Sequence, residues 1–85
     1  IGKRLRTLAG NLQILAVTHS PQVAAQSHQH LLIAKSETGK DKRMATTVAP
    51  LSETARREEL ARMLSGDIVT EAARAQAREL MARSA

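Results

Sequence analysis

The chain has 85 residues, of which 42% are hydrophobic and none is aromatic, and its formal net charge is +5. A chain of this length forms one small domain at most, and without Phe, Tyr or Trp its core is thin. The sequence has no cysteine and no long apolar run, which excludes a disulfide framework and a membrane-spanning helix and agrees with a cytoplasmic protein.

The first half of the chain predicts a helix, a buried strand and a second, short helix. The apolar residues of 1–9 recur at helical spacing, and Gly10-Asn11 can end this helix through a left-handed cap. The near-continuous apolar run Leu12–Thr18 is typical of a buried strand in an α/β sheet. Ser20 is a good N-cap and the proline after it suits a first helical position, so we expect a helix over 21–27.

The second half predicts a hairpin followed by a helical pair. Two strands, 31–35 and 43–49, flank a polar loop over 36–42. Ser52 then caps a helix that reaches about residue 65, and Thr70 caps the last helix. The order αβαββαα favours an α/β architecture over a helical bundle. We treat 1–85 as one unit, with the sheet part in 1–50 and the helical pair in 51–85.

The charged residues of the last two helices predict solvated helix faces. Arginines and glutamates are interleaved in Arg56–Glu59 and in Arg74–Arg83. Glu58 and Arg62 have the spacing of a supportive i,i+4 ion pair. The net positive charge permits binding to nucleic acid, but no aromatic side chain is available to stack on bases.

His19 is the strongest candidate for chemistry. In open α/β sheets ligands bind beyond the carboxyl ends of the strands, and His19 follows the predicted strand and precedes a helix N-terminus. An imidazole there can donate a hydrogen bond to a phosphate. Thr18 and Ser20 are supporting hydroxyls, and Gln22 could reach a ligand. The alternative is a histidine that only caps a strand end.

Two other patterns carry less chemistry. His28 and His30 lie two residues apart, but no cysteine or matching carboxylate accompanies them, so they predict an exposed turn and no metal site. Gly39-Lys40 lacks the upstream glycine and the following Ser or Thr of a phosphate-binding Walker A loop.

Two blocks carry a resemblance to a known family. They are THSPQVAA with the nearby His30, and ARREELARMLSG, within VTHSPQVAAQSHQHLLIAK and LSETARREELARMLSGDIVTEAARAQARELM. Together they resemble the C-terminal part of the ATPase head of the bacterial RecN family of DNA repair proteins, which is similar to the SMC and Rad50 ATPases. The resemblance covers essentially the whole chain. Ser20 departs from it, because the family often has Leu there.

The resemblance implies a partial ABC-type ATPase head. It implies that His19 is the switch histidine of the H-loop, which contacts the γ-phosphate of ATP and helps to hold the attacking water. It also implies a parent protein that binds ATP and Mg²⁺, joins the rest of its head, pairs with a second head, and repairs DNA double-strand breaks by recombination at the nucleoid.

The Walker A, Walker B and signature motifs are absent from this sequence. The chain alone is therefore expected neither to hydrolyse ATP nor to bind it tightly, because phosphoryl transfer needs a P-loop lysine and Mg²⁺. The alternative from another class is a non-enzymatic basic α/β module that binds DNA or a protein partner.

Overall fold

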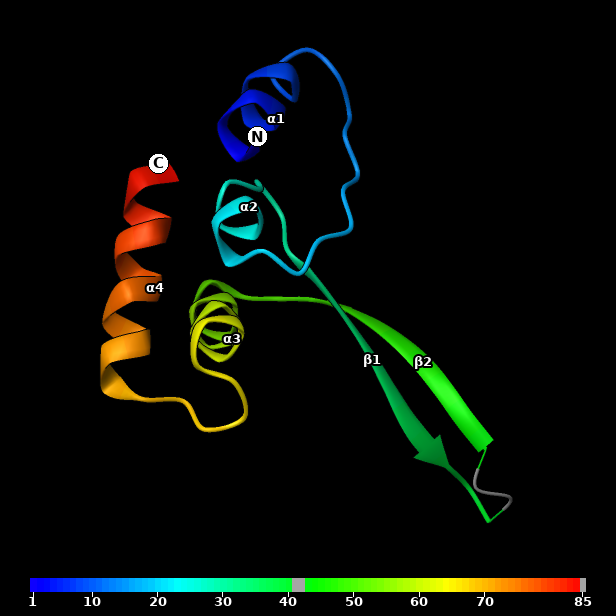
Figure 1. The fold of residues 1–85 in the computed structure, drawn as a ribbon. Helices are drawn as coiled ribbons and strands as arrows, with labels where there is room; N and C mark the ends of the chain where they lie inside the picture. The colour runs from blue at the N-terminus through cyan, green and yellow to red at the C-terminus, as the bar shows by residue number, and fades with distance from the viewer. Residues whose placement is uncertain (41–42, 85) are drawn as a thin grey trace.

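The computed structural model of the chain describes residues 1–40 and 43–84. In chain order its elements are α1 (Gly2–Leu8), α2 (Pro21–Ala25), β1 (Leu31–Thr38), β2 (Arg43–Pro50), α3 (Glu53–Ser65) and α4 (Glu71–Ser84). The helices pack into one body, and the β1–β2 hairpin projects away from it (Figure 1). This is the mixed α/β class that the sequence predicts, with an antiparallel hairpin flanked by helices.

Side-chain caps begin three of the helices, as predicted. The hydroxyls of Ser20, Ser52 and Thr70 each accept a hydrogen bond from the backbone N–H three residues further on, at 3.3, 3.2 and 3.1 Å. Such bonds satisfy donors that have no partner inside the helix. Gly66 ends α3 with φ +84°, a conformation that strains residues with a side chain.

The core lies where α3 and α4 pack together and α2 covers them. Leu60 is the largest fully buried side chain among the described residues. Its buried neighbours in the cluster are all alanines, and several partly buried aliphatic side chains surround it: Ala24, Ala25, Ala61, Ala73, Ala77, Met63, Leu64, Val69, Leu80 and Met81. Alanine lets the three helices approach closely, but each buried alanine removes little apolar surface from water. Leu60, Ala61, Met63 and Leu64 form the apolar stripe by which α3 faces this core.

The ion pairs of α3 and α4 differ from the prediction. Arg62 pairs with Glu59 in place of Glu58. Glu58 instead accepts hydrogen bonds from Arg74, at 2.9 Å between Nη2 and Oε1, and so joins α3 to α4. This hydrogen bond lowers the pKa of Glu58. The predicted pair between Glu58 and Arg62 is wrong because a partner on the neighbouring helix lies within reach.

The segment Leu12–Thr18 is not the buried strand that the sequence predicts. It crosses from α1 to α2 without strand pairing (Figure 1), and Leu15 and Val17 are 82% and 85% exposed. A strand needs the hydrogen bonds of a neighbour, and the one strand pairing within the described ranges joins β1 to β2. The apolar run therefore has no sheet here in which to be buried.

The end of α1 also differs from the prediction. Ala9 follows the helix in a right-handed conformation, with φ −66° and ψ −11°. The N–H of Gly10 then bonds to the carbonyl of Thr7 at 3.2 Å, and Gly10 does not have the positive φ of a left-handed cap. The N–H groups of residues 10–12 bond to the last carbonyls of the helix, and the left-handed cap predicted at Gly10 is wrong.

The hairpin is antiparallel, as predicted, and runs in register from Leu31 opposite Pro50 to Thr38 opposite Arg43. β1 extends three residues beyond the predicted strand end at 35, because the polar residues that follow still pair with β2. The predicted loop over 36–42 therefore shortens, and its last two residues, Asp41 and Lys42, lie outside the described residues.

The register places four apolar side chains on one face of the hairpin, beside Lys35 and Glu37. In an antiparallel pair, opposed residues share a face. Ile33 lies opposite Val48, and Leu31 and Met44 lie on the same side of the pair. All four side chains are exposed.

No helix in the part of the chain that the structure describes is long and apolar enough to span a membrane.

Candidate functional site

The turn over residues 18–22 brings together the polar side chains that the sequence analysis grouped. The N–H of Ser20 donates to Thr18 Oγ1 at 3.0 Å, and the hydroxyl of Ser20 donates to Gln22 Oε1 at 3.2 Å. The same hydroxyl accepts from the N–H of Val23 as the N-cap of α2. Thr18, Ser20 and Gln22 therefore fix the conformation of the turn itself.

His19 lies at the apex of this turn and is exposed. Its ring enters none of the hydrogen bonds found among residues 1–40 and 43–84. The prediction that it directly precedes a helix N-terminus is confirmed, whereas the strand predicted before it is absent from the described structure. The imidazole of His19 therefore lies at the surface, and hydrogen bonds of Thr18 and Ser20 fix the backbone on either side of it.

The turn leads directly into α2, and α2 packs against α1 and α3. Gly2 lets α1 approach α2 closely, because a Cβ at that position would meet Gln26 Cγ at 2.8 Å and Val23 Cα at 3.3 Å. Arg6 of α1 donates from Nη1 to the carbonyl of Gln26 at 2.6 Å. The other end of α2 from His19 is thus fixed by a neighbouring helix.

Arg56 is the residue that sequence reasoning missed. It was expected on a solvated face, but it is half-buried, and its Nη2 lies 2.7–3.2 Å from the carbonyl oxygens of Ala24, Ala25 and Ser27. Burial lowers the pKa of Arg56, and Glu53 opposes this shift. The spacing held a signal, because Arg56 precedes Leu60 by four residues and so continues the apolar stripe of α3.

His28 and His30 have different surroundings. His28 is exposed, as expected of a turn, whereas His30 is half-buried with Nδ1 shielded from water. Burial lowers the pKa of His30, the charge of Arg56 lowers it further, and Glu59 raises it. No group of three or more metal-binding side chains occurs among the residues that the structure describes.

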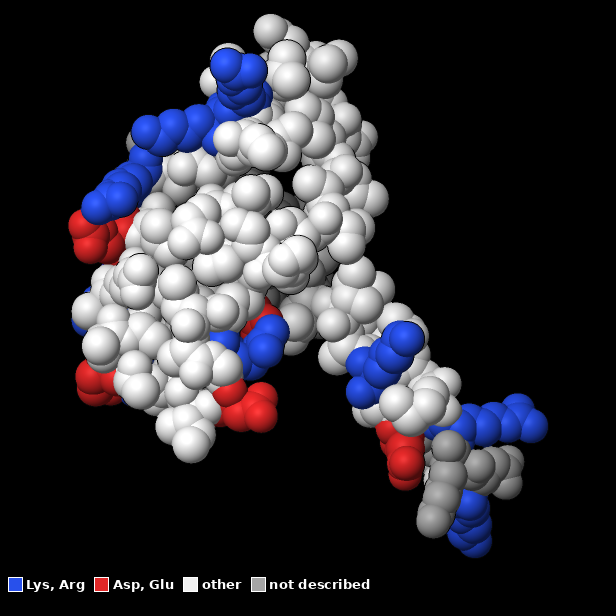
Figure 2. All heavy atoms as spheres, viewed as in Figure 1, with Lys and Arg blue, Asp and Glu red and all other residues white. Residues whose placement is uncertain are grey.

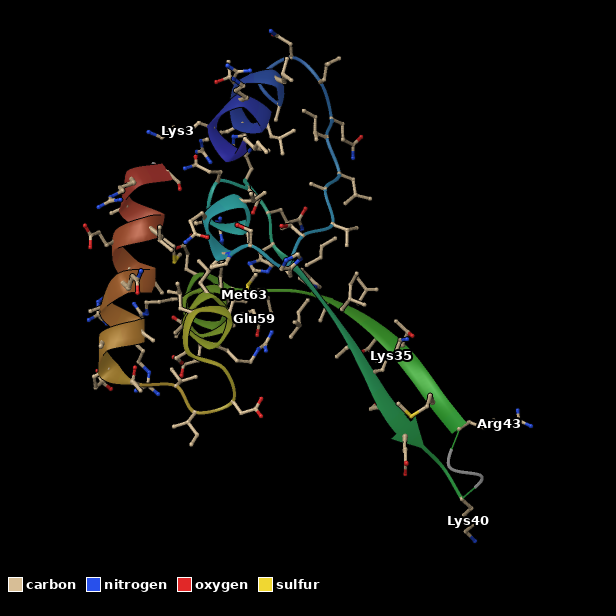
Figure 3. All side chains as sticks on the ribbon, in the orientation of Figure 1. Lys3, Lys35, Lys40, Arg43, Glu59 and Met63 are labelled. Atoms are coloured by element: carbon tan, nitrogen blue, oxygen red, sulfur yellow. The ribbon has the colours of Figure 1, made fainter. Side chains whose placement is uncertain are left out.

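The hairpin carries basic side chains toward its far end. Lys35, Lys40 and Arg43 lie there (Figure 3), and Figure 2 shows the lysine and arginine side chains gathered at this end with acidic atoms beside them. The hairpin, which we call the arm, therefore carries Leu31, Ile33 and Val48 nearer the helices and basic side chains toward its far end.

The fold and the turn over residues 18–22 define the class of the protein. It is an α/β module in which a turn fixed by hydrogen bonds exposes His19. No family model matches the chain. Curated proteins named DNA repair protein RecN are similar to it over 95% of its length, with 41% identity over 81 residues in Rickettsia felis, 43% over 82 residues in Vibrio cholerae and 44% over 81 residues in Streptomyces coelicolor.

Over nearly its whole length, the chain therefore resembles a segment of RecN proteins. It spans 14% of the length of each of these relatives.

Proposed function

We propose that this chain is the segment of a RecN-type ATPase head that carries the switch histidine, in a protein that repairs DNA double-strand breaks by recombination. The observation that carries the proposal is the position of His19, exposed on a turn held by Ser20 and α2. The similarity to relatives named DNA repair protein RecN supports the role in repair.

The chemistry of the turn fits a phosphate ligand. A neutral imidazole can donate one hydrogen bond to a terminal phosphate oxygen, and it can orient a water molecule beside it. The other polar groups of the turn are hydroxyls and an amide, with no carboxylate among residues 18–22. Mg²⁺, which neutralises charge on a transferring phosphoryl group when bound, would be held by residues elsewhere in the head.

The exposed segment Leu12–Thr18 supports a larger head around this chain. Leu12, Leu15 and Val17 place apolar side chains in water along one extended stretch. Such a stretch is stabilised when neighbouring strands pair with it and cover both of its faces. We propose that the rest of the head supplies those strands, which would set His19 at the carboxyl end of a sheet strand where ligands bind.

Replacing His19 by Ala in the full-length protein tests the proposal. Losing a group that contacts the reacting phosphate is expected to lower the kcat for ATP hydrolysis about 100-fold. The melting temperature is expected to stay unchanged, because the side chain is exposed. His28→Ala is the matched control, an exposed histidine outside the turn. Normal turnover in His19→Ala would remove the sensor role.

A second candidate function is direct contact with DNA by the hairpin arm, in a basic module that is not itself catalytic. Lys35 and Lys40 lie toward the far end of the arm, where phosphates would be accessible. Their replacement by Gln in the full-length protein is expected to weaken duplex DNA binding and to reduce its salt dependence. An unchanged affinity and salt dependence would exclude this contact.

The remaining parts of the proposal concern the assembly. Two heads would engage around bound ATP, as the resemblance to SMC-type ATPases implies, and the protein would act on DNA at the nucleoid, in the cytoplasm. Sedimentation of the full-length protein with and without ATP tests the pairing of heads. A molecular mass that does not depend on nucleotide would contradict it.

A further inference from the structure

Two guanidinium groups from different helices hold the C-terminal end of α2. Arg56 Nη2 of α3 lies 2.7 Å from the carbonyl oxygen of Ser27, 2.9 Å from that of Ala25 and 3.2 Å from that of Ala24. Arg6 Nη1 of α1 donates to the carbonyl of Gln26 at 2.6 Å. Four consecutive carbonyls at this end therefore face a positive charge.

These contacts are stronger than ordinary surface hydrogen bonds. The last carbonyls of a helix have no partner within it and carry partial negative charge, which a cation offsets. Arg56 is half-buried, so water screens its charge less than it screens that of an exposed arginine. Nη2 of Arg56 has two hydrogens, which three carbonyls share. A small shift of this nitrogen would therefore weaken its hydrogen bonds to all three carbonyls.

The braced end of α2 is a short distance from the candidate site. α2 has five residues and is about 7.5 Å long at the helical rise. Ser20 caps one end of this rigid piece and thereby fixes the turn that carries His19, while the two arginines fix the other. A displacement of the end held by the two arginines would therefore shift the turn.

We infer that Arg56, assisted by Arg6, is a positioning residue for His19. The inference rests on the proposed function, in which His19 contacts the γ-phosphate. Arg56 itself points to the backbone of α2 and has no role in contacting the nucleotide.

The test measures ATP hydrolysis by the full-length protein carrying Arg56→Ala, Arg56→Lys or Arg6→Ala. Because misplacing a reacting group by about 1 Å costs up to about 100-fold, Arg56→Ala is expected to lower kcat by about 10- to 100-fold with little change in KM. Arg56→Lys keeps the charge and is expected to restore part of the loss. Arg6→Ala, which removes one hydrogen bond, is expected to lower kcat less.

Arg57→Ala is the matched control, a neighbouring arginine on α3 that donates none of the hydrogen bonds to α2 in the described structure. It is expected to leave kcat unchanged. Amide hydrogen exchange over residues 20–27 is expected to be faster in Arg56→Lys and Arg6→Ala than in Arg57→Ala at equal melting temperature. This comparison remains available if Arg56→Ala fails to fold.

Combining Arg56→Lys with His19→Ala separates positioning from a general structural effect. If Arg56 acts through His19, the double variant hydrolyses ATP as slowly as His19→Ala alone. If the two losses multiply, or if folded Arg56 and Arg6 variants keep normal kcat while His19→Ala loses it, the positioning role is overturned and the sensor role stands. If His19→Ala keeps normal kcat, the proposed function fails, and with it the positioning role.

Discussion

Truncating Leu60 to Ala perturbs the centre of the helical core. Leu60 is fully buried, and the other buried members of its cluster are alanines, which cannot extend into the space that the leucine leaves. Substitutions of this kind cost about 2–5 kcal/mol, which combines lost burial with the cavity that remains. Small domains have a free energy of unfolding near or below about 5 kcal/mol, so we expect the substitution to remove a large part of the stability.

Urea unfolding of the 85-residue chain, followed by circular dichroism at 222 nm, measures this loss. With a slope of about 1 kcal/mol per molar urea, a loss of about 3 kcal/mol moves the midpoint by about 3 M. Leu15→Ala is the matched control, because Leu15 is 82% exposed and its truncation is expected to change the stability by less than about 0.5 kcal/mol. Equal losses in the two variants would refute the assignment of the core to α3, α4 and α2.

Three further results are expected. Ser52→Ala removes the N-cap of α3 and should cost about 1 kcal/mol in the same urea assay, whereas no change would mean that the cap bond is not formed in solution. In the full-length protein, where we propose that strands cover Leu12–Thr18, Leu15→Ala should lower the melting temperature, and a neutral result would contradict that cover. Burial lowers the pKa of His30, so the folded state binds fewer protons than the unfolded state and stability should fall as the pH drops below about 6.5. His30→Gln should remove this dependence and His28→Gln should not, and equal slopes in both variants would contradict it.

Local patterns in the sequence predicted the elements that local interactions stabilise. Ser20, Ser52 and Thr70 each bond to a backbone N–H three residues away, so the caps and the helices after them could be placed from the sequence alone. The hairpin and the stripe around Leu60 are likewise encoded in short stretches. The hydrogen bonds that join Thr18, Ser20 and Gln22 are local in the same way.

The errors at Arg56, Glu58 and Leu12–Thr18 arose because the partner lies far along the chain or outside it. Arg56 bonds to carbonyls 29–32 residues away, and no feature of its own helix specifies those acceptors. Glu58 pairs with Arg74 on the next helix, 16 residues away. Leu12–Thr18 has the composition of a strand, but composition cannot supply the neighbouring strand that pairing requires.

The affinity of the full-length protein for ADP and for a non-hydrolysable ATP analogue tests the central proposal most directly. The two ligands differ by the γ-phosphate. A contact from His19 to that phosphate therefore strengthens binding of the ATP analogue and leaves the affinity for ADP nearly unchanged. We predict that His19→Ala lowers the preference for the ATP analogue by about 10-fold or more, the value of a hydrogen bond to a charged group, while His28→Ala leaves it unchanged. The same preference in wild type and His19→Ala would contradict the assignment of His19 as the γ-phosphate sensor.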